Sequence, residues 1–320
     1  MKRRAFTQGA LAALTAAQFP SLARAQAIGT LKMMIPANPG GGWDSTGRAL
    51  AAAMQSAKAV GSVQFENKGG AAGTLGLAQF INSAKGDPNA LMMGGMVMVG
   101  GILLNKSPVD LSMVTPIARL TSEYEVIVVP ASSPHKTLAD LLAAYKANPG
   151  AVSWGGGSAG GTDHILAGMV VKAAGADATK VNYVPFKGGG EAVAAIVGGH
   201  VTAGVSGLSE FSEHIKGGRM RALGVSAPGR KEGILTLKEA GVDVVLGNWR
   251  GAFGGPGLSS AQRDGLVRAV KAGVDSPAWR DTLVKQGWDE AWLAGDAYKA
   301  FVDEDIKRIA AILDSLGMRK

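Results

Sequence analysis

A glycine run between an apolar stretch and a helical pattern is the part of the chain best suited to bind an anion. Residues 31–35 are apolar with β character, glycines occupy 40–42, and a helical pattern begins near Asp44. Glycine lets the backbone approach a ligand closely, and a helix start offers unpaired N–H groups and a partial positive charge. Such a site suits a carboxylate or phosphate. The alternative is a tight turn in which Asp44 or Ser45 caps the helix.

The same arrangement recurs later in the chain. The strand expected at 152–154 runs into glycines at 155–157, and a helix is expected from Thr162. Further glycine turns occur at Gly69 and Gly188. In open α/β sheets, ligands bind beyond the carboxyl ends of the strands, where such turns lie. We therefore expect the four turns to surround one cleft.

Two enzyme motifs overlap the second glycine turn. Residues 155–160 fit G-x-G-x-x-G, but the next expected strand ends at Lys187 instead of the acid that would hold a ribose hydroxyl, which argues against a dinucleotide site. Residues 156–160 also fit the G-x-S-x-G pattern of serine hydrolases around Ser158. A triad could use a histidine at 200 or 214 with Asp177. Glycine-rich turns produce this pattern easily, so an exported serine hydrolase is kept as the alternative function.

Other catalytic or metal chemistry has little support. The four histidines, at 135, 164, 200 and 214, show no metal-ligand spacing, and the chain has no cysteine and no Walker A motif. We predict no enzyme activity, no metal and no cofactor. The candidate ionic groups near the glycine turns are Arg48, Lys68, Lys187 and Arg250.

The first 27 residues have the pattern of an export signal. Arg3 and Arg4 precede an uncharged apolar stretch at 10–19, and small residues near Ala25 and Ala27 provide cleavage sites. The paired arginines followed by Phe6 look like a twin-arginine signal, with a Sec signal as the alternative. Removing this segment takes four bases and no acid from the formal charge of +8, which leaves about +4. The remaining bases are scattered, so nucleic acid is not an expected partner.

Strand-like and helix-like runs alternate through the mature chain, which predicts an α/β fold with βαβ units and a mostly parallel sheet. The apolar run 126–129 ends at Pro130 and suits a strand that leaves one lobe for another. The chain returns near Arg250 and is mostly helical after Ser259. We therefore predict a first lobe from residues 28–128 and 251–320 and a second lobe from 129–250, with crossings near Val128 and Arg250.

Six segments in order resemble the substrate-binding proteins of tripartite tricarboxylate transporters, also called Bug receptors. They are residues 36–44, 67–74, 129–141, 155–164, 184–189 and 217–225. Any one segment is a weak signal, whereas the ordered set spans nearly the whole mature chain. The resemblance implies a two-lobed type II periplasmic binding protein fold with two hinge crossings.

The resemblance also implies a function. A protein of this family closes on a small carboxylate and delivers it to a membrane permease of one large and one small subunit. In the family, one ligand carboxylate is held by the first loop and by the loop that faces it, here residues 38–46 and 158–163. The pair Trp43-Asp44 and the run 160–164 look closest to the tricarboxylate, citrate-type branch.

We therefore expect a monomeric periplasmic receptor for a di- or tricarboxylate. A sensor that presents its closed form to a signalling partner fits the sequence equally well. The residues expected to contact the ligand are Asn38, Gly40, Gly41, Gly42, Trp43, Asp44, Thr46, Gly73, Thr74, Ser158, Gly161, Thr162, Asp163, Lys187 and Ser206.

Overall fold

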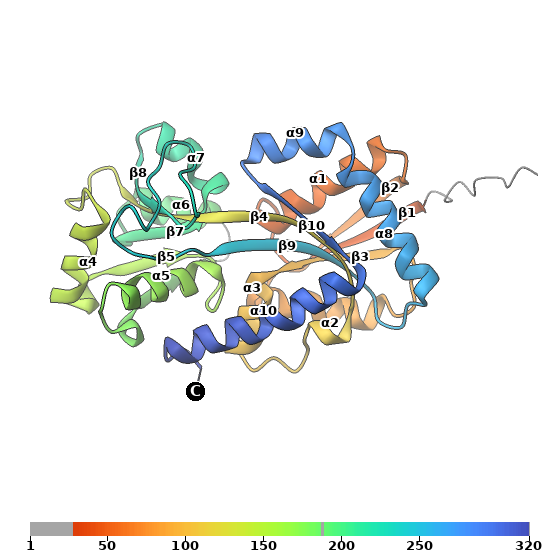
Figure 1. Ribbon diagram of the computed structural model, residues 1–320, viewed down its shortest axis with the longest axis horizontal. Helices are drawn as coiled ribbons and strands as arrows, with labels where there is room; N and C mark the ends of the chain where they lie inside the picture. The colour runs from red at the N-terminus through yellow and green to blue at the C-terminus, as the bar shows by residue number, and fades with distance from the viewer. Residues whose placement is uncertain (1–27, 187–188, 320) are drawn as a thin grey trace, which may run out of the picture.

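One long strand, β4 (Thr115–Pro130), belongs to both lobes of the computed structural model (Figure 1). Its residues 115–124 pair antiparallel with β9 (Gly247–Gly254). Its residues 125–130 pair with β7 (Ala203–Gly207) and β8 (Met220–Val225). The strand therefore passes from one lobe to the other between Tyr124 and Glu125.

The structure describes residues 28–186 and 189–319. The predicted export signal at 1–27 and the predicted site residue Lys187 lie outside this part of the chain. Among the described residues, no helix is long and apolar enough to cross a membrane.

The first lobe holds the strand order β2-β1-β3-β9-β4, with β10 paired to β4. The pairs β1–β2 and β1–β3 are parallel, while β3–β9, β4–β9 and β10–β4 are antiparallel. The strands not yet bounded are β1 (Ile28–Ile35), β2 (Val60–Asn67), β3 (Ala90–Gly95) and β10 (Asp289–Ala294).

The second lobe repeats this plan with fewer strands. Strand β5 (Ser153–Gly156) pairs in parallel with β6 (Asn182–Pro185) and with β7, and β7 pairs antiparallel with β4. The expectation of a mostly parallel sheet was therefore wrong. The βαβ units are parallel, but the strands that link the lobes run antiparallel to their neighbours.

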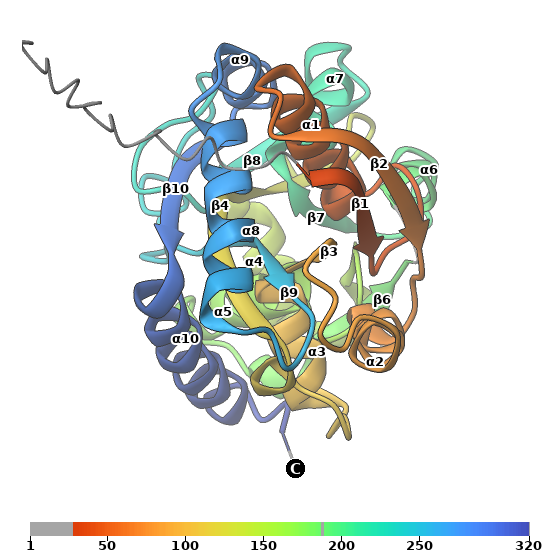
Figure 2. The same ribbon diagram turned by 90° about the vertical axis from the view of Figure 1, so that its right-hand side faces the viewer.

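The helices of the first lobe surround its strands, and Figure 2 shows α8 and α10 on the opposite side from α2. They are α1 (Gly42–Ser56), α2 (Thr74–Ser83), α3 (Met96–Leu104), α8 (Ser260–Val274), α9 (Pro277–Gln286) and α10 (Gly295–Ser315). Apolar residues recur on one face of α1, and this face buries Leu50 and Met54 in the core. Burial of such a face supplies most of the stability of a surface helix.

The second lobe contains four α-helices among its described residues. They are α4 (Leu138–Ala147), α5 (Thr162–Ala173), α6 (Gly189–Val197) and α7 (Leu208–Lys216). Part of its interior is a separate apolar cluster that includes Val126, Ile196 and Phe211. The end of the chain returns to this lobe, because Lys172 Nζ on α5 donates to the Ser315 carbonyl at 2.9 Å.

The chain changes its strand partners between Tyr124 and Glu125 and again near Gly247. On the return path, the Leu246 N–H still bonds to Ser226 of the second lobe, whereas β9 from Gly247 onward pairs with first-lobe strands and with the first-lobe part of β4. The lobe boundaries at Val128 and Arg250 stay a prediction.

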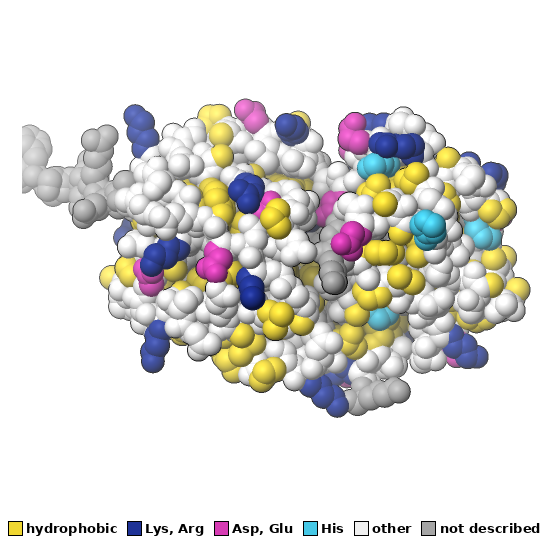
Figure 3. All heavy atoms as spheres, turned by 180° about the vertical axis from the view of Figure 1, so that it is seen from behind, with side chains coloured by type: hydrophobic (Ala, Val, Ile, Leu, Met, Phe, Trp, Pro, Cys, Tyr) yellow, Lys and Arg dark blue, Asp and Glu magenta, His cyan; other side chains and the backbone are white. Residues whose placement is uncertain are grey.

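On the face shown in Figure 3, lysine and arginine side chains stand singly or in small groups, not in one patch.

Candidate functional site

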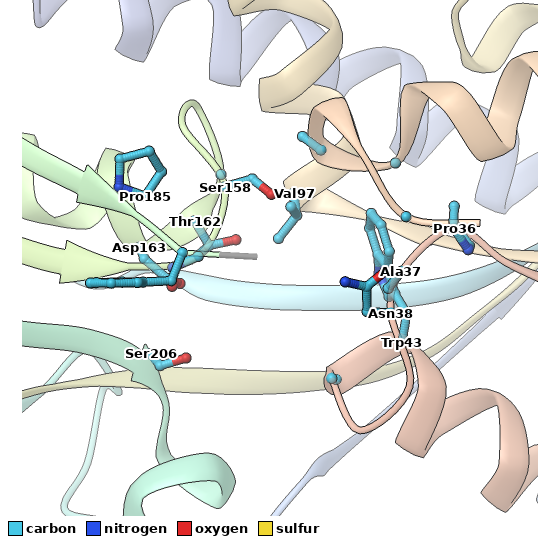
Figure 4. A pocket seen from close by; sticks show the side chains of 18 of the residues that line it. Pro36, Ala37, Asn38, Trp43, Val97, Ser158, Thr162, Asp163, Pro185 and Ser206 are labelled. Atoms are coloured by element: carbon cyan, nitrogen blue, oxygen red, sulfur yellow. The ribbon is translucent and has the colours of Figure 1, made fainter. Parts of the chain in front are cut away.

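A cavity of about 670 Å³ lies between the lobes and is lined by residues from both (Figure 4). This volume is in the usual range for small-molecule sites. The lining includes most of the residues expected from the sequence: Asn38, Gly41, Gly42, Trp43, Gly73, Ser158, Gly161, Thr162, Asp163 and Ser206. Figure 4 shows Asn38 and Trp43 on one side of the cavity and Ser158, Thr162 and Asp163 on the other.

Four expected residues are not part of the lining. Asp44 accepts hydrogen bonds from the Gly40 N–H at 3.0 Å and from Arg48 Nε at 2.9 Å, so its carboxylate holds the first loop in shape. Thr46 donates to the carbonyl of Gly42 at 2.8 Å. Thr74 donates to the carbonyl of Ala71 at 2.9 Å. Gly40, Asp44, Thr46 and Thr74 thus shape the loops beside the cavity, and a direct ligand contact by them stays a prediction.

Helix α1 begins at the cavity without a side-chain cap. Its N-cap residue is Gly41, and no side chain accepts a hydrogen bond there. The alternative in which Asp44 or Ser45 caps this helix does not form, because Gly41 is the N-cap residue and Asp44 accepts from Gly40, which precedes the helix. A helix start that lacks a side-chain acceptor presents its N–H groups and partial positive charge to whatever fills the cavity.

Trp43 forms part of this wall because Gly73 makes room for its ring. A Cβ built on Gly73 would lie 2.7 Å from the Trp43 ring, and the Gly73 backbone has a φ of +90°. Both features favour glycine at this position. Trp43 is buried against the glycine loop at residues 69–73, and part of its side chain lines the cavity.

Helix α5 begins at the opposite wall in the same way. Its N-cap is Gly161, again without a side-chain cap. The preceding loop is held by side chains, since Asp163 accepts from the Gly157 N–H at 2.6 Å and Tyr183 Oη donates to the Gly157 carbonyl at 2.9 Å. The Asp163 contact repeats the contact that Asp44 makes to Gly40.

His164 fixes the other end of this loop. Its Nδ1 accepts from the Gly160 N–H at 3.1 Å, and its ring stacks on Tyr183 with centroids 4.2 Å apart. Burial lowers the pKa of His164 to about 4, so the ring is neutral near pH 7 and its Nδ1 can accept. The loop is therefore shaped in advance of any ligand.

The two lobes touch beside the cavity. A Cβ built on Gly100 of α3 would lie 1.9 Å from the carbonyl oxygen of Gly160. The backbone of the first lobe therefore packs directly against the backbone of the loop that precedes α5. Val97 of the same helix lines the cavity. This close contact needs a glycine at position 100.

An acidic cluster, made of Glu123, Glu125, Asp163 and Glu210, borders the cavity on the side of the crossing strands. Of its members, only Asp163 was expected at the site from the sequence. Asp163 and Glu210 line the cavity together with Arg250 and Asn248. Arg250 is one of the ionic groups that the sequence offers for the site, whereas Glu210 and Asn248 are not. The available signal was the pair of acids at 123 and 125, directly before the apolar run 126–129.

The Arg250 guanidinium is tied to this cluster. It donates a hydrogen bond to the Glu123 carboxylate, and its Nη1 donates to Thr46 Oγ1 at 3.4 Å. The guanidinium also stacks over the Trp288 ring. Glu123 also accepts from the Ser209 N–H at the start of α7, at 2.9 Å. A Cβ built on Gly42 would lie 2.4 Å from Arg250 Nη2, so the start of α1 packs directly on the guanidinium.

The buried acids hold their protons more tightly than acids in water. Burial raises the pKa of Glu210 to about 7, and the negative charges of Glu123 and Asp163 add to this shift while Arg250 opposes it. Burial raises the pKa of Asp163 to about 6 against the opposing hydrogen bond from Gly157. Burial and the neighbouring acids place the pKa of Glu125 well above its usual range. The cluster thus carries fewer charges near pH 7 than its number of carboxyls.

The serine-hydrolase arrangement does not form among the described residues. Ser158 faces the cavity (Figure 4), but no hydrogen bond joins it to a histidine in the described ranges. The side chain of Asp177 accepts from the N–H and hydroxyl of Thr179. The described contacts therefore give Ser158 no base.

Two lobes joined by crossing strands around a ligand-sized cavity define a solute-binding protein of the periplasmic type. The chain belongs to the tripartite tricarboxylate transporter receptor family, whose sequence model matches residues 47–318. It is 30% identical to the UPF0065 protein in the gbd 5′ region of Cupriavidus necator, over 99% of this chain and 97% of that one. The family is one of solute-binding receptors, and the absence of enzyme activity stays a prediction.

Solved structures share the fold. The periplasmic binding protein BugD superposes with a TM-score of 0.81 at 23% identity, covering 91% of this chain and 98% of that one. MatC from Rhodopseudomonas palustris, solved with bound malate, superposes with a TM-score of 0.77 at 22% identity, covering 89% and 98%. The two-lobed fold expected from the sequence is thereby confirmed.

Proposed function

We propose that this protein is an exported receptor that captures a small di- or tricarboxylate, such as a citrate-like acid, and delivers it to a permease of one large and one small subunit. It acts as a monomer in the periplasm after cleavage of the segment 1–27. The family supports the transport role, and the malate bound to MatC supports a small carboxylate as the class of ligand.

One observation carries the proposal. Helices α1 and α5 come from different lobes, begin at the same cavity, and have N-caps without a side-chain acceptor. Each helix start presents N–H donors and a partial positive charge, and a carboxylate between them accepts from both. The hydroxyls of Ser158 and Thr162 on the second wall supply further donors.

Binding on both walls couples the ligand to the relative position of the lobes. The ligand favours the arrangement in which both helix starts reach it, so it shifts the population toward the closed form. The hinge lies in β4 near Glu125 and in the segment before β9, where the chain passes between lobes. The permease then recognises the closed form.

Isothermal titration tests this function. The protein is unfolded and refolded to remove any co-purified ligand, then titrated with citrate, tricarballylate, succinate, malate, glutamate and terephthalate. We expect at least one acid to bind with a Kd below about 100 μM, roughly −5.5 kcal/mol. If none of them binds, the receptor proposal loses its support. Uptake of the binding acid in cells that lack this gene separates transport from sensing.

A further inference from the structure

The two walls of the cavity are framed by contacts at matching positions. Asp44 is the third residue of α1 and accepts from the N–H of Gly40, which lies two residues before the helix. His164 is the third residue of α5 and accepts from the N–H of Gly160, again two residues before the helix. Both glycines have a positive φ, +88° and +78°. The two loops therefore turn into their helices in the same way, although their sequences differ.

A second contact reaches each loop from the neighbouring strand. On the first wall, Asn67 ends β2, which pairs in parallel with β1, and its Nδ2 donates to the Ala37 carbonyl at 3.0 Å. On the second wall, Tyr183 lies on β6, which pairs in parallel with β5, and its Oη donates to the Gly157 carbonyl at 2.9 Å. In both lobes, a side chain from the adjacent parallel strand thus holds a carbonyl of the loop.

The two contacts of each wall are joined to each other. Asn67 Nδ2 also donates to Asp44 Oδ1 at 2.9 Å, and the Tyr183 ring stacks on the ring of His164 with centroids 4.2 Å apart. None of these four side chains belongs to the described residues that line the cavity. A change at Asn67 or Tyr183, which are both uncharged, therefore reaches a ligand only through the loop.

Loops that are fixed before binding raise the affinity. A ligand that must order a loop loses binding free energy to that ordering, whereas a loop already in its bound form costs nothing further. The contacts to Gly40 and Gly160 use N–H groups that precede the helices. The N–H groups at the starts of α1 and α5 have no side-chain cap and stay available to a ligand. The two frames thus prepare both walls for binding.

Resting on the proposed function, we propose that Asn67 and Tyr183 are positioning residues for the ligand, one for each wall. Each holds its loop in the binding geometry before the ligand arrives and does not touch the ligand itself. Loss of either contact therefore weakens the binding of every acid by a similar factor. A residue that contacts the ligand instead changes the ranking of the acids, because each acid uses that contact differently.

Tyr183→Phe tests the second wall. The substitution removes the hydroxyl that donates to Gly157 and keeps the ring that stacks on His164. Isothermal titration measures the Kd of each acid that binds among malate, succinate and citrate. We expect each Kd to rise threefold or more, and the factors for the different acids to agree within twofold.

Tyr145→Phe is the matched control. Tyr145 is fully buried in the same lobe, and its Oη donates to the Asp177 carbonyl at 2.8 Å, which is the same kind of bond as at Tyr183. Neither Tyr145 nor Asp177 is among the described residues that line the cavity. Urea unfolding is expected to show a loss of stability in both variants, whereas only Tyr183→Phe raises the Kd. A purely structural role for Tyr183 would make the two variants alike in affinity.

Asn67→Ala tests the first wall in the same titration. It removes the donor to the Ala37 carbonyl and to Asp44, so we again expect a rise in Kd of threefold or more that is similar for all acids. The control is Asn82→Ala on α2, since Asn82 Nδ2 also donates to a backbone carbonyl, that of Ala78, at 2.9 Å. This control is expected to leave the Kd unchanged.

Hydrogen exchange of the protein without ligand measures the loops directly. In Tyr183→Phe, the amides of Gly157 and Gly160 are expected to exchange at least threefold faster, while the Gly40 amide is unchanged. In Asn67→Ala, the pattern is reversed. Unchanged exchange in the affected loop would show that the side chain does not hold it, and would overturn the positioning role.

The titrations separate this role from the receptor proposal. If acids bind the wild type but the Kd rises less than threefold in a variant, the residue concerned has no positioning role while the receptor stands. The same holds if Tyr145→Phe weakens binding as much as Tyr183→Phe, or if the factors for two acids differ more than twofold. If no acid binds the wild type, the receptor proposal fails and the positioning role with it.

Discussion

The guanidinium of Arg250 on β9 donates a hydrogen bond to the carboxylate of Glu123 on β4, and both side chains are almost completely buried. The pair stands where the lobes join and where α1 begins, since Gly42 packs on the same guanidinium. A charge that is neutralised inside the protein is not free to hold a ligand carboxylate alone. This relationship assigns Arg250 to the frame of the cavity and leaves the helix starts as the main anion-binding elements.

Removing the charge of one partner is expected to be more destabilising than the double replacement would suggest. Arg250→Gln or Glu123→Gln alone leaves a buried charge without its partner, which destabilises by about 3–5 kcal/mol. The double variant leaves two neutral amides that can still bond to each other, so we expect it to be at least about 1 kcal/mol more stable than the sum of the single effects predicts. Urea unfolding without ligand measures all four free energies, and simple additivity would contradict the prediction.

Gly41→Val is expected to weaken ligand binding without harming the fold. The nearest atom to a Cβ at Gly41 is the Asn38 carbonyl oxygen at 3.7 Å, and the backbone there is extended with a φ of −83°. The free energy of unfolding should stay within about 0.5 kcal/mol of the wild type. The added methyl groups enter the cavity beside the α1 N–H groups, so affinity should fall tenfold or more. Calorimetric titration and urea unfolding measure the two effects.

Gly73→Ala is the contrasting control, because here the fold itself is expected to suffer. The new methyl meets the Trp43 ring, and the φ of +90° strains any residue other than glycine. Strain of this kind costs of order 1–3 kcal/mol. Equal stability losses at Gly41 and Gly73 would show that the geometry of the first wall is misassigned.

The two walls were predictable from the sequence because their signal is local. A strand, a glycine run and a helix start within about fifteen residues identify such a loop, and the loops at 38–43 and 158–163 indeed meet at one cavity. What each polar residue does inside a loop was less accessible. Asp44 could cap its own helix or hold Gly40, and only the folded loop shows that it does the latter.

The acidic cluster depends on contacts between distant parts of the chain. Glu123 and Arg250 are 127 positions apart in the sequence, and Glu210 joins the cluster from α7. Nothing local marks a glutamate in a strand as buried. The same limit applies to the length of β4, since the apolar run 126–129 marks only its second-lobe part, and to β10, whose half-exposed residues lack a clear alternation.

Ser158→Ala is expected to reduce affinity modestly while leaving the loop intact. Ser158 lines the cavity on the second wall, whereas the loop is held by Asp163, Tyr183 and His164. Loss of one hydroxyl donor to a carboxylate costs about 1–2 kcal/mol, or roughly a five- to thirtyfold weaker Kd. Titration of the binding acid measures this change, with urea unfolding as the check on stability. An unchanged Kd would remove Ser158 from the binding residues.

The acidic cluster also makes stability depend on pH in a direction unusual for a carboxylate. The pKa of Glu210 is about 7 in the folded chain against 4.5 for an ordinary glutamate. Between these values the folded chain holds more protons than the unfolded chain, so the free energy of unfolding falls as pH rises. This contribution is present below about pH 4.5 and is lost as the pH rises through about 7. Asp163, with a pKa of about 6, acts in the same direction.

His164 acts in the opposite direction, because its pKa of about 4 lies below the usual 6.5 and its contribution is lost as the pH falls. The effect of Glu210 is therefore isolated by comparing the wild type with Glu210→Gln, without ligand, at pH 5 and pH 8. The quantity to compare is the free energy of unfolding of the variant minus that of the wild type. We expect this difference to be larger at pH 8 than at pH 5 by about 1 kcal/mol or more. Urea unfolding measures this difference, with Glu213→Gln as control. A difference that is the same at both pH values would mean that Glu210 is not held in a proton-retaining site.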